Sequence, residues 1–137
     1  RWAFRTELAP EPPPLEVKEK FLVAMMDFLE EAPSSGKWGI WVAEDDGLIV
    51  SHVYIQRIRK VPRPVNFEAE MGYLTNMYTL PAYRGKGIGA ELLRHAVDWA
   101  RSQKLDMVIL WPAKGRQAFY MRGGFGPEQE AMTQSLE

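Results

Sequence analysis

A glycine-rich turn flanked by two cations is the stretch of this sequence best suited to chemistry. The turn reads Tyr83-Arg84-Gly85-Lys86-Gly87-Ile88-Gly89. It follows a strand-like apolar run, Tyr73–Leu80, and opens an amphipathic helix, Ile88–Ser102. Such a turn gathers free backbone N–H groups at the positive end of a helix macrodipole, which makes an anion site. Because Arg84 and Lys86 add formal charge, we expect a phosphate or pyrophosphate here.

Two other phosphate-binding patterns compete with this interpretation. The Walker string Gly-x-x-x-x-Gly-Lys-Ser/Thr does not occur in the sequence. The dinucleotide fingerprint G-x-G-x-x-G/A is matched literally by Gly85, Gly87 and Ala90, and Asp106 follows about 20 residues later. The fingerprint's acid belongs at the carboxyl end of the second strand, however, whereas Asp106 lies at the start of a predicted strand. About 80 residues also precede the turn, so a dinucleotide-binding oxidoreductase is the weaker alternative.

The elements that must position the turn follow from hydrophobic periodicity. We expect helices at Leu15–Glu31, Ile88–Ser102 and Arg116–Met121, and strands at Trp38–Ala43, Leu48–Arg59, Tyr73–Leu80 and Asp106–Trp111. An Asp46-Gly47 step predicts a hairpin between the first two strands. The last two strands and the helix between them form a right-handed βαβ unit.

Several segments have weaker patterns. The unbroken apolar run 107–111 predicts a strand covered on both faces, and the proline-containing stretch 61–69 predicts a loop. Residues 1–14 are expected to be extended, with 1–5 an edge strand or a frayed end. The tail 131–136 is a candidate last strand.

Composition narrows the class of protein. The 137 residues suit one domain, and 46% hydrophobic residues suffice for a core. Seventeen basic against 18 acidic residues give a net charge of −1, so no nucleic-acid partner is expected. The absence of Cys and the presence of only two His predict no metal site. The sequence shows neither a membrane-spanning run nor a signal peptide, so a cytoplasmic location is expected. The chain begins at Arg1 and not at Met.

Three stretches resemble the GCN5-related N-acetyltransferases. The glycine turn fits that family's R/Q-x-x-G-x-G/A signature, and Asn76–Pro81 resembles its fourth strand. The stretch Ala118–Phe125 resembles the family's ending, in which a Tyr precedes a Gly-Phe pair. The order of the elements also agrees. The resemblance is best over residues 38–125 and implies one α/β domain over 1–137, with a central mixed sheet splayed between two parallel strands and flanked by helices.

The resemblance also implies a cofactor and the residues that hold it. Acetyl-coenzyme A would lie between the strands Tyr73–Leu80 and Asp106–Trp111, with its pantetheine arm pairing along Met77, Tyr78 and Thr79. Its pyrophosphate would bind the turn and the start of the helix. The residues expected there are Arg84, Gly85, Lys86, Gly87, Ile88, Gly89 and Ala90. The family often has Asn seven residues before the Tyr, where this chain has Ala113.

Candidate catalytic residues follow from the same resemblance. Tyr120 would protonate the departing thiolate as general acid, and Glu70 and His52 are candidate general bases. Asn76 is a poor strand former, so it marks either a bulge that opens the sheet or a surface-facing side chain.

The most concrete function is therefore N-acetyl transfer from acetyl-coenzyme A to a primary amine of a small molecule or peptide, by direct attack and without a metal. A non-catalytic acyl-coenzyme A sensor stays open beside the oxidoreductase. The expected partner is the amine acceptor, with no membrane or nucleic acid, and homodimers are common in the family.

Overall fold

The computed structural model describes residues 1–127 and 131–136. Its helices are α1 (Trp2–Thr6), α2 (Leu15–Glu31), the single 3₁₀ turn η1 (Pro81–Tyr83), α3 (Ile88–Ser102) and α4 (Gln117–Arg122). Its strands are β1 (Trp38–Asp45), β2 (Leu48–Arg59), β3 (Glu70–Thr79) and β4 (Val108–Ile109). The predicted bounds of α2, β2 and α3 are confirmed, because each has a long periodic pattern that ends at Pro, Gly or polar residues.

The four strands form one mixed sheet in the order β1-β2-β3-β4. The first three are antiparallel neighbours, whereas β4 runs parallel to β3. Only two pairs join β3 to β4, at Gly72 with Val108 and at Tyr73 with Ile109. Beyond Tyr73 the two segments part, and β3 continues to Thr79 without a partner on that edge in the described chain. The predicted α/β fold with splayed parallel strands is confirmed.

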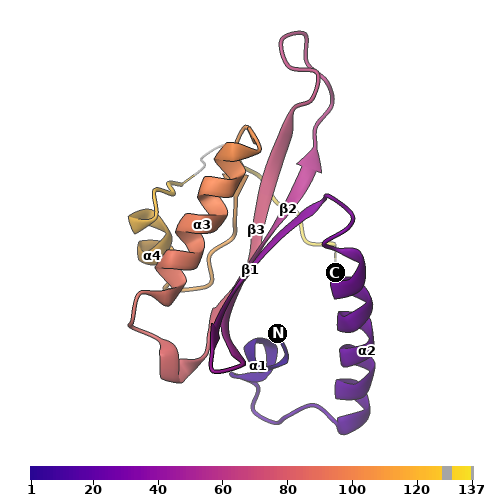
Figure 1. Cartoon of the computed structure of the whole chain (residues 1–137), viewed down its shortest axis with the longest axis vertical. Coiled ribbons are helices and arrows are strands. Elements are labelled where there is room, and N and C mark those ends of the chain that lie inside the picture. Colours follow the sequence, from indigo (N-terminus) through magenta and orange to yellow (C-terminus); the bar gives the residue numbers. More distant parts are fainter. Residues whose placement is uncertain (128–130, 137) are drawn as a thin grey trace.

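Helices lie on both faces of this sheet (Figure 1). Val53 and Ile55 of β2 are fully buried in a core cluster with Leu92, Leu93 and Ala96 of α3. Tyr54, between them in sequence, faces the other way and stacks on Phe28 of α2 with ring centroids 6.1 Å apart. This alternation is the ordinary period of a strand. It places α3 and α4 on one face and α1 and α2 on the other.

Three predictions about the weaker segments were wrong. Residues 2–6 form the helix α1 and not an edge strand, because Trp2 packs against Phe21 of α2 and holds one helical turn in place. The strand predicted over 106–111 pairs only at Val108–Ile109, and Trp111 is 59% exposed, so the run is not covered on both faces. The tail 131–136 contains no strand.

Within the described residues, no helix is both long enough and apolar enough to cross a bilayer.

Candidate functional site

The glycine turn adopts the backbone that an anion site requires. Gly85 and Gly87 have φ of 73° and 80°, in the left-handed region that side chains disfavour. Gly87 is the N-cap of α3, and the first helical bond joins the Glu91 N–H to its carbonyl. The preceding amides, from Ile88 to Ala90, therefore have no acceptor within the helix. The space where a Cβ would stand at either glycine is empty, so backbone conformation, not crowding within the protein, requires glycine here.

A large cavity of about 1430 Å³ runs from this turn along the open edge of β3 to α4. Its lining includes the turn residues Arg84, Gly85 and Gly87, and it also includes the helix start, Ile88–Ala90. The predicted arm-binding residues Met77, Tyr78 and Thr79 line it as well, together with Tyr120. The structure therefore places the glycine turn and Tyr120, which lie about 30 residues apart in the sequence, along one cavity.

Positive charge is concentrated around this cavity, although the whole chain is slightly acidic. Among the described residues, eight Arg and Lys line it, against two acidic residues, Glu7 and Asp98. The cations are Arg1, Arg5, Arg84, Arg94, Arg101, Lys114, Arg116 and Arg122. Asp98 pairs with Arg94 and Arg101, whose guanidinium groups lie 3.2 and 2.9 Å from its carboxylate. The field inside the cavity therefore favours a ligand with several negative charges.

The two cations of the turn are placed differently. The Arg84 guanidinium donates to the Thr79 carbonyl over 2.9 Å and to both carboxylate oxygens of Glu7 over 2.7 and 3.0 Å. The hydrogen bond from Arg84 is the main reason that the pKa of Glu7 lies below its ordinary value. The Lys86 ammonium does not line the large cavity and lies over the Tyr83 ring, 5.4 Å from its centroid.

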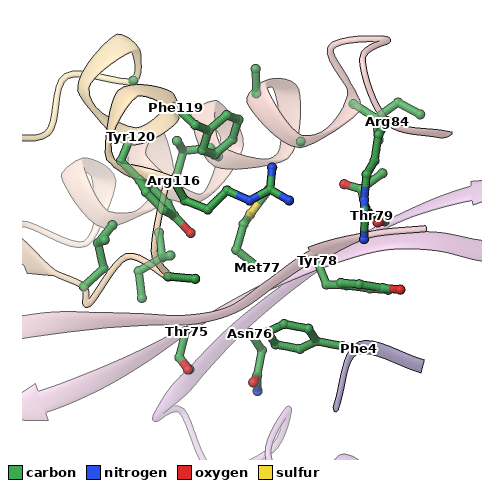
Figure 2. A pocket seen from close by; sticks show the side chains of 18 of the residues that line it. Phe4, Thr75, Asn76, Met77, Tyr78, Thr79, Arg84, Arg116, Phe119 and Tyr120 are labelled. Atoms are coloured by element: carbon green, nitrogen blue, oxygen red, sulfur yellow. Dashed lines mark hydrogen bonds between the residues drawn. The ribbon is translucent and has the colours of Figure 1, made fainter. Parts of the chain in front are cut away.

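A β-bulge interrupts β3 beside the cavity. The register with β2 shifts between His52 and Tyr54, and Asn76 has φ of 54°. The bulge interpretation of Asn76 is confirmed. In Figure 2 the Met77 side chain points to the side of Tyr120, whereas the Asn76 side chain points to the opposite side of β3, the side on which Phe4 lies. The cavity therefore has two sides, separated by β3.

Tyr120 lies half-buried on the α4 side, with its ring 5.1 Å from that of Phe119. Burial raises the pKa of the Tyr120 phenol, and the nearby positive charge of Arg116 opposes that shift. The phenol therefore keeps its proton at neutral pH and is available as a donor.

The two candidate bases do not line the cavity. Glu70 lies at the start of β3, where it accepts hydrogen bonds from the Arg57 guanidinium. The buried His52 Nδ1 lies 2.5 Å from the carbonyl oxygen of Asn76, and Nε2 has no partner among the described residues. Burial lowers the pKa of His52 to about 4. The structure does not bring either residue together with Tyr120.

Phe4, Glu7 and Arg116 are among the lining residues that the sequence did not predict. Phe4 and Glu7 belong to the N-terminal segment, and Phe4 stacks on Tyr78 with centroids 5.0 Å apart. Nothing in the local pattern predicts that long-range contact. Arg116 extends toward Met77 (Figure 2). Arg116 is the N-cap of α4 and lies four residues before Tyr120, and that spacing could have indicated its place beside Tyr120.

Asp106, the acid of the dinucleotide alternative, is held by another cluster. Its carboxylate accepts hydrogen bonds from Lys60 over 3.0 Å, from Arg63 over 2.5 Å and from Asn66 over 3.2 Å. These bonds tie the 61–69 loop to the start of the β4 segment and give Asp106 a structural role. In the described part of the chain, no group of three or more His, Asp or Glu residues is arranged to hold a metal ion.

Comparison with known proteins gives a consistent result. The model of the acetyltransferase (GNAT) family matches residues 2–125. An uncharacterized N-acetyltransferase of Methanocaldococcus jannaschii is 28% identical over 103 residues, which cover 65% of this chain and 46% of that protein. The chain thus spans less than half the length of this curated relative.

Solved structures agree in fold. A predicted acetyltransferase from Clostridium acetobutylicum, crystallised with acetyl-CoA, has a TM-score of 0.71 and 26% identity, with 90% of this chain and 78% of that chain covered. A GCN5-related N-acetyltransferase from Ralstonia eutropha has a TM-score of 0.74 and 22% identity, with 100% and 88% covered. With the family model matching nearly the whole chain, this protein belongs to the acetyltransferase (GNAT) family.

Proposed function

We propose that this protein transfers acetyl from acetyl-coenzyme A to the nitrogen of a primary amine, by direct attack. The single observation that carries the proposal is the continuous cavity that joins the glycine turn, the open edge of β3 and the Tyr120 phenol. Coenzyme A is a long ligand with phosphates at one end and a thiol at the other. A cavity with a phosphate cradle at one end and a proton donor at the other suits it.

The residues present fit the cofactor. The free amides from Ile88 to Ala90 and the cationic lining favour the phosphates. The unpaired edge of β3 at Met77–Thr79 offers backbone groups to the amides of the pantetheine arm, as a neighbouring strand would. Bound acetyl-coenzyme A supplies an activated acetyl group as a thioester.

Tyr120 is proposed as the proton donor. The amine nitrogen forms a bond to the acetyl carbon as the carbon–sulfur bond breaks, and the Tyr120 hydroxyl gives its proton to the leaving sulfur. A thiol has an ordinary pKa near 8.5, so a positioned phenol can assist its departure. The attacking neutral amine loses one proton to solvent as the amide forms, and the Tyr120 phenolate takes one proton back from solvent, so the step balances. We assign the base role to neither Glu70 nor His52, because neither lines the cavity.

The test separates catalysis from binding. Acetyl transfer to a panel of amines and peptides is measured by release of free coenzyme A, and coenzyme A affinity is measured by calorimetry. Tyr120→Phe should lower kcat by about 100-fold, the low end for general acid catalysis, and leave the coenzyme A Kd within about twofold of its wild-type value, since it keeps the ring. Tyr83→Phe is the control, because Tyr83 also lines the cavity but its hydroxyl donates to the Asp45 carboxylate over 2.8 Å.

Other outcomes support the alternatives. A wild-type protein that binds coenzyme A and acetylates no amine in the panel would be an acyl-coenzyme A sensor. Thermal stabilisation by NAD(H), with none by coenzyme A, would indicate a dinucleotide-binding protein.

A further inference from the structure

One face of α1 forms a wall of the cavity. Arg1, Phe4, Arg5 and Leu8 all line it, and their spacing of three, four and seven residues places them on one side of a helical turn and its extension. Phe4 lies on the side of β3 opposite Tyr120 (Figure 2). This wall therefore borders the part of the cavity that lies on the opposite side of β3 from Tyr120.

Aromatic side chains complete this part of the cavity. Tyr73 and Trp111, from the point where β3 and the β4 segment separate, meet at 71° with ring centroids 5.3 Å apart. The Arg1 guanidinium lies over the Phe4 ring, 5.3 Å from its centroid. The Asn76 side chain points to the same side (Figure 2). This part of the cavity thus combines flat apolar surfaces with cations and one amide.

The two cations of this wall, Arg1 and Arg5, have no counter-ion among the residues that the structure describes. In the described part of the chain, neither the Arg1 nor the Arg5 guanidinium forms an ion pair with a carboxylate. Glu7, the acidic residue of the same segment, binds Arg84 and the Tyr78 hydroxyl instead. Burial, together with repulsion by Arg5, lowers the pKa of Arg1. Two like charges that face one cavity are stabilised when an anion binds between them.

The cavity is correspondingly unsuited to a polycation. The two acidic residues of its described lining, Glu7 and Asp98, are already paired with arginines. A polyamine would therefore meet cations without a free carboxylate among the described lining residues, and like-charge contacts of this kind disfavour binding.

We propose that the acceptor is a primary amine that also carries an anionic group, a carboxylate or a phosphate, held by Arg1 and Arg5 with its body against Tyr73 and Trp111. The inference rests on the proposed acetyl transfer and names the class of its second substrate.

The test uses amines that differ only in the anion. Transfer rates are compared for phenylalanine against phenethylamine and for O-phosphoethanolamine against ethanolamine, with spermidine as a polycation. In at least one pair the anionic member should have a kcat/KM at least about tenfold higher, the effect of one charge-assisted hydrogen bond. The pair with the larger difference identifies the anion.

Arg5→Gln should reduce that preference by about tenfold and leave the coenzyme A Kd within about twofold of its wild-type value. Arg59→Gln, at an exposed arginine at the far end of β2, is the matched control and should change neither quantity. Equal or better transfer to spermidine or to the neutral amines would overturn the inference, as would an Arg5→Gln variant with an unchanged preference.

A binding measurement keeps the two proposals distinguishable. N-acetylphenylalanine and N-acetylphenethylamine are titrated into the coenzyme A-loaded protein by calorimetry, which requires no turnover. Tighter binding of N-acetylphenylalanine than of N-acetylphenethylamine, with the difference lost in Arg5→Gln, supports the anion site even if no amine is acetylated. A failure to acetylate any amine would contradict only the proposed transfer. Equal binding of the two compounds contradicts the anion site alone.

Discussion

Replacing Gly87 by Ala separates the backbone role of the turn from its role in binding. Gly87 has φ of 80° and Gly36, between α2 and β1, has φ of 68°. A Cβ built at either position meets no atom within 4 Å. Both substitutions therefore introduce the same left-handed strain and no clash, and only Gly87 lines the cavity. Gly36→Ala is thus a matched control.

The expected magnitudes differ between the two measurements. Left-handed strain costs about 1–2 kcal/mol for a residue with a Cβ. Each variant should therefore lose about that much unfolding free energy, with a fall in Tm of roughly 3–8 °C for a domain of this size. If the methyl group at position 87 removes one charge-assisted hydrogen bond to phosphate, worth about 1.5–3 kcal/mol, the coenzyme A Kd should rise roughly 10- to 150-fold.

Thermal melts and calorimetric titration with coenzyme A check both parts. We expect similar losses of Tm in Gly87→Ala and Gly36→Ala, and weaker coenzyme A binding only in Gly87→Ala. A Gly87→Ala protein that binds coenzyme A as tightly as Gly36→Ala would refute the reasoning, because phosphate would then not contact this turn.

Three further predictions follow from contacts elsewhere. Burial holds the pKa of His52 at about 4, below the ordinary 6.5, so the unfolded chain binds one more proton than the folded chain between these pH values. The wild type should therefore lose about 3 kcal/mol of unfolding free energy as the pH falls from 6.5 to 4. Urea titrations at pH 7 and pH 4 should show this loss in the wild type and not in His52→Gln. Glu7→Gln should free the Arg84 guanidinium and tighten coenzyme A binding, more at low than at high salt; unchanged calorimetric affinity would show that Arg84 does not contact the phosphates. Gly39→Ala should cost about 1–3 kcal/mol by chemical denaturation, since its Cβ would overlap the Trp41 ring; wild-type stability would mean that the ring moves aside freely.

Long periodic segments were predictable because their patterns are local. The bounds of α2, β2 and α3 follow from runs of apolar residues at regular spacing, and the bulge at Asn76 follows from a poor strand former inside a strand. The short β4 was not predictable, because Leu110 and Trp111 are apolar residues that line a cavity and do not continue a ladder. Apolar character alone does not distinguish these two environments.

The candidate site also has a part that the sequence predicts and a part that it does not. The glycine turn carries its own backbone signal, so its place beside the cavity could be predicted. The contact of Phe4 with Tyr78 joins residues 74 positions apart, and the bond between Glu7 and Arg84 spans 77. Such contacts depend on how α1 packs on the sheet, and no local sequence pattern predicts that packing.

The amide signals of the turn give the most direct test of phosphate binding. ¹⁵N-labelled protein is titrated with coenzyme A and, separately, with pantetheine, which lacks the phosphates. The amides of Gly85, Gly87 and Gly89 should shift with coenzyme A and stay in place with pantetheine. If coenzyme A binds while those three amides keep their positions, the turn is not the phosphate site.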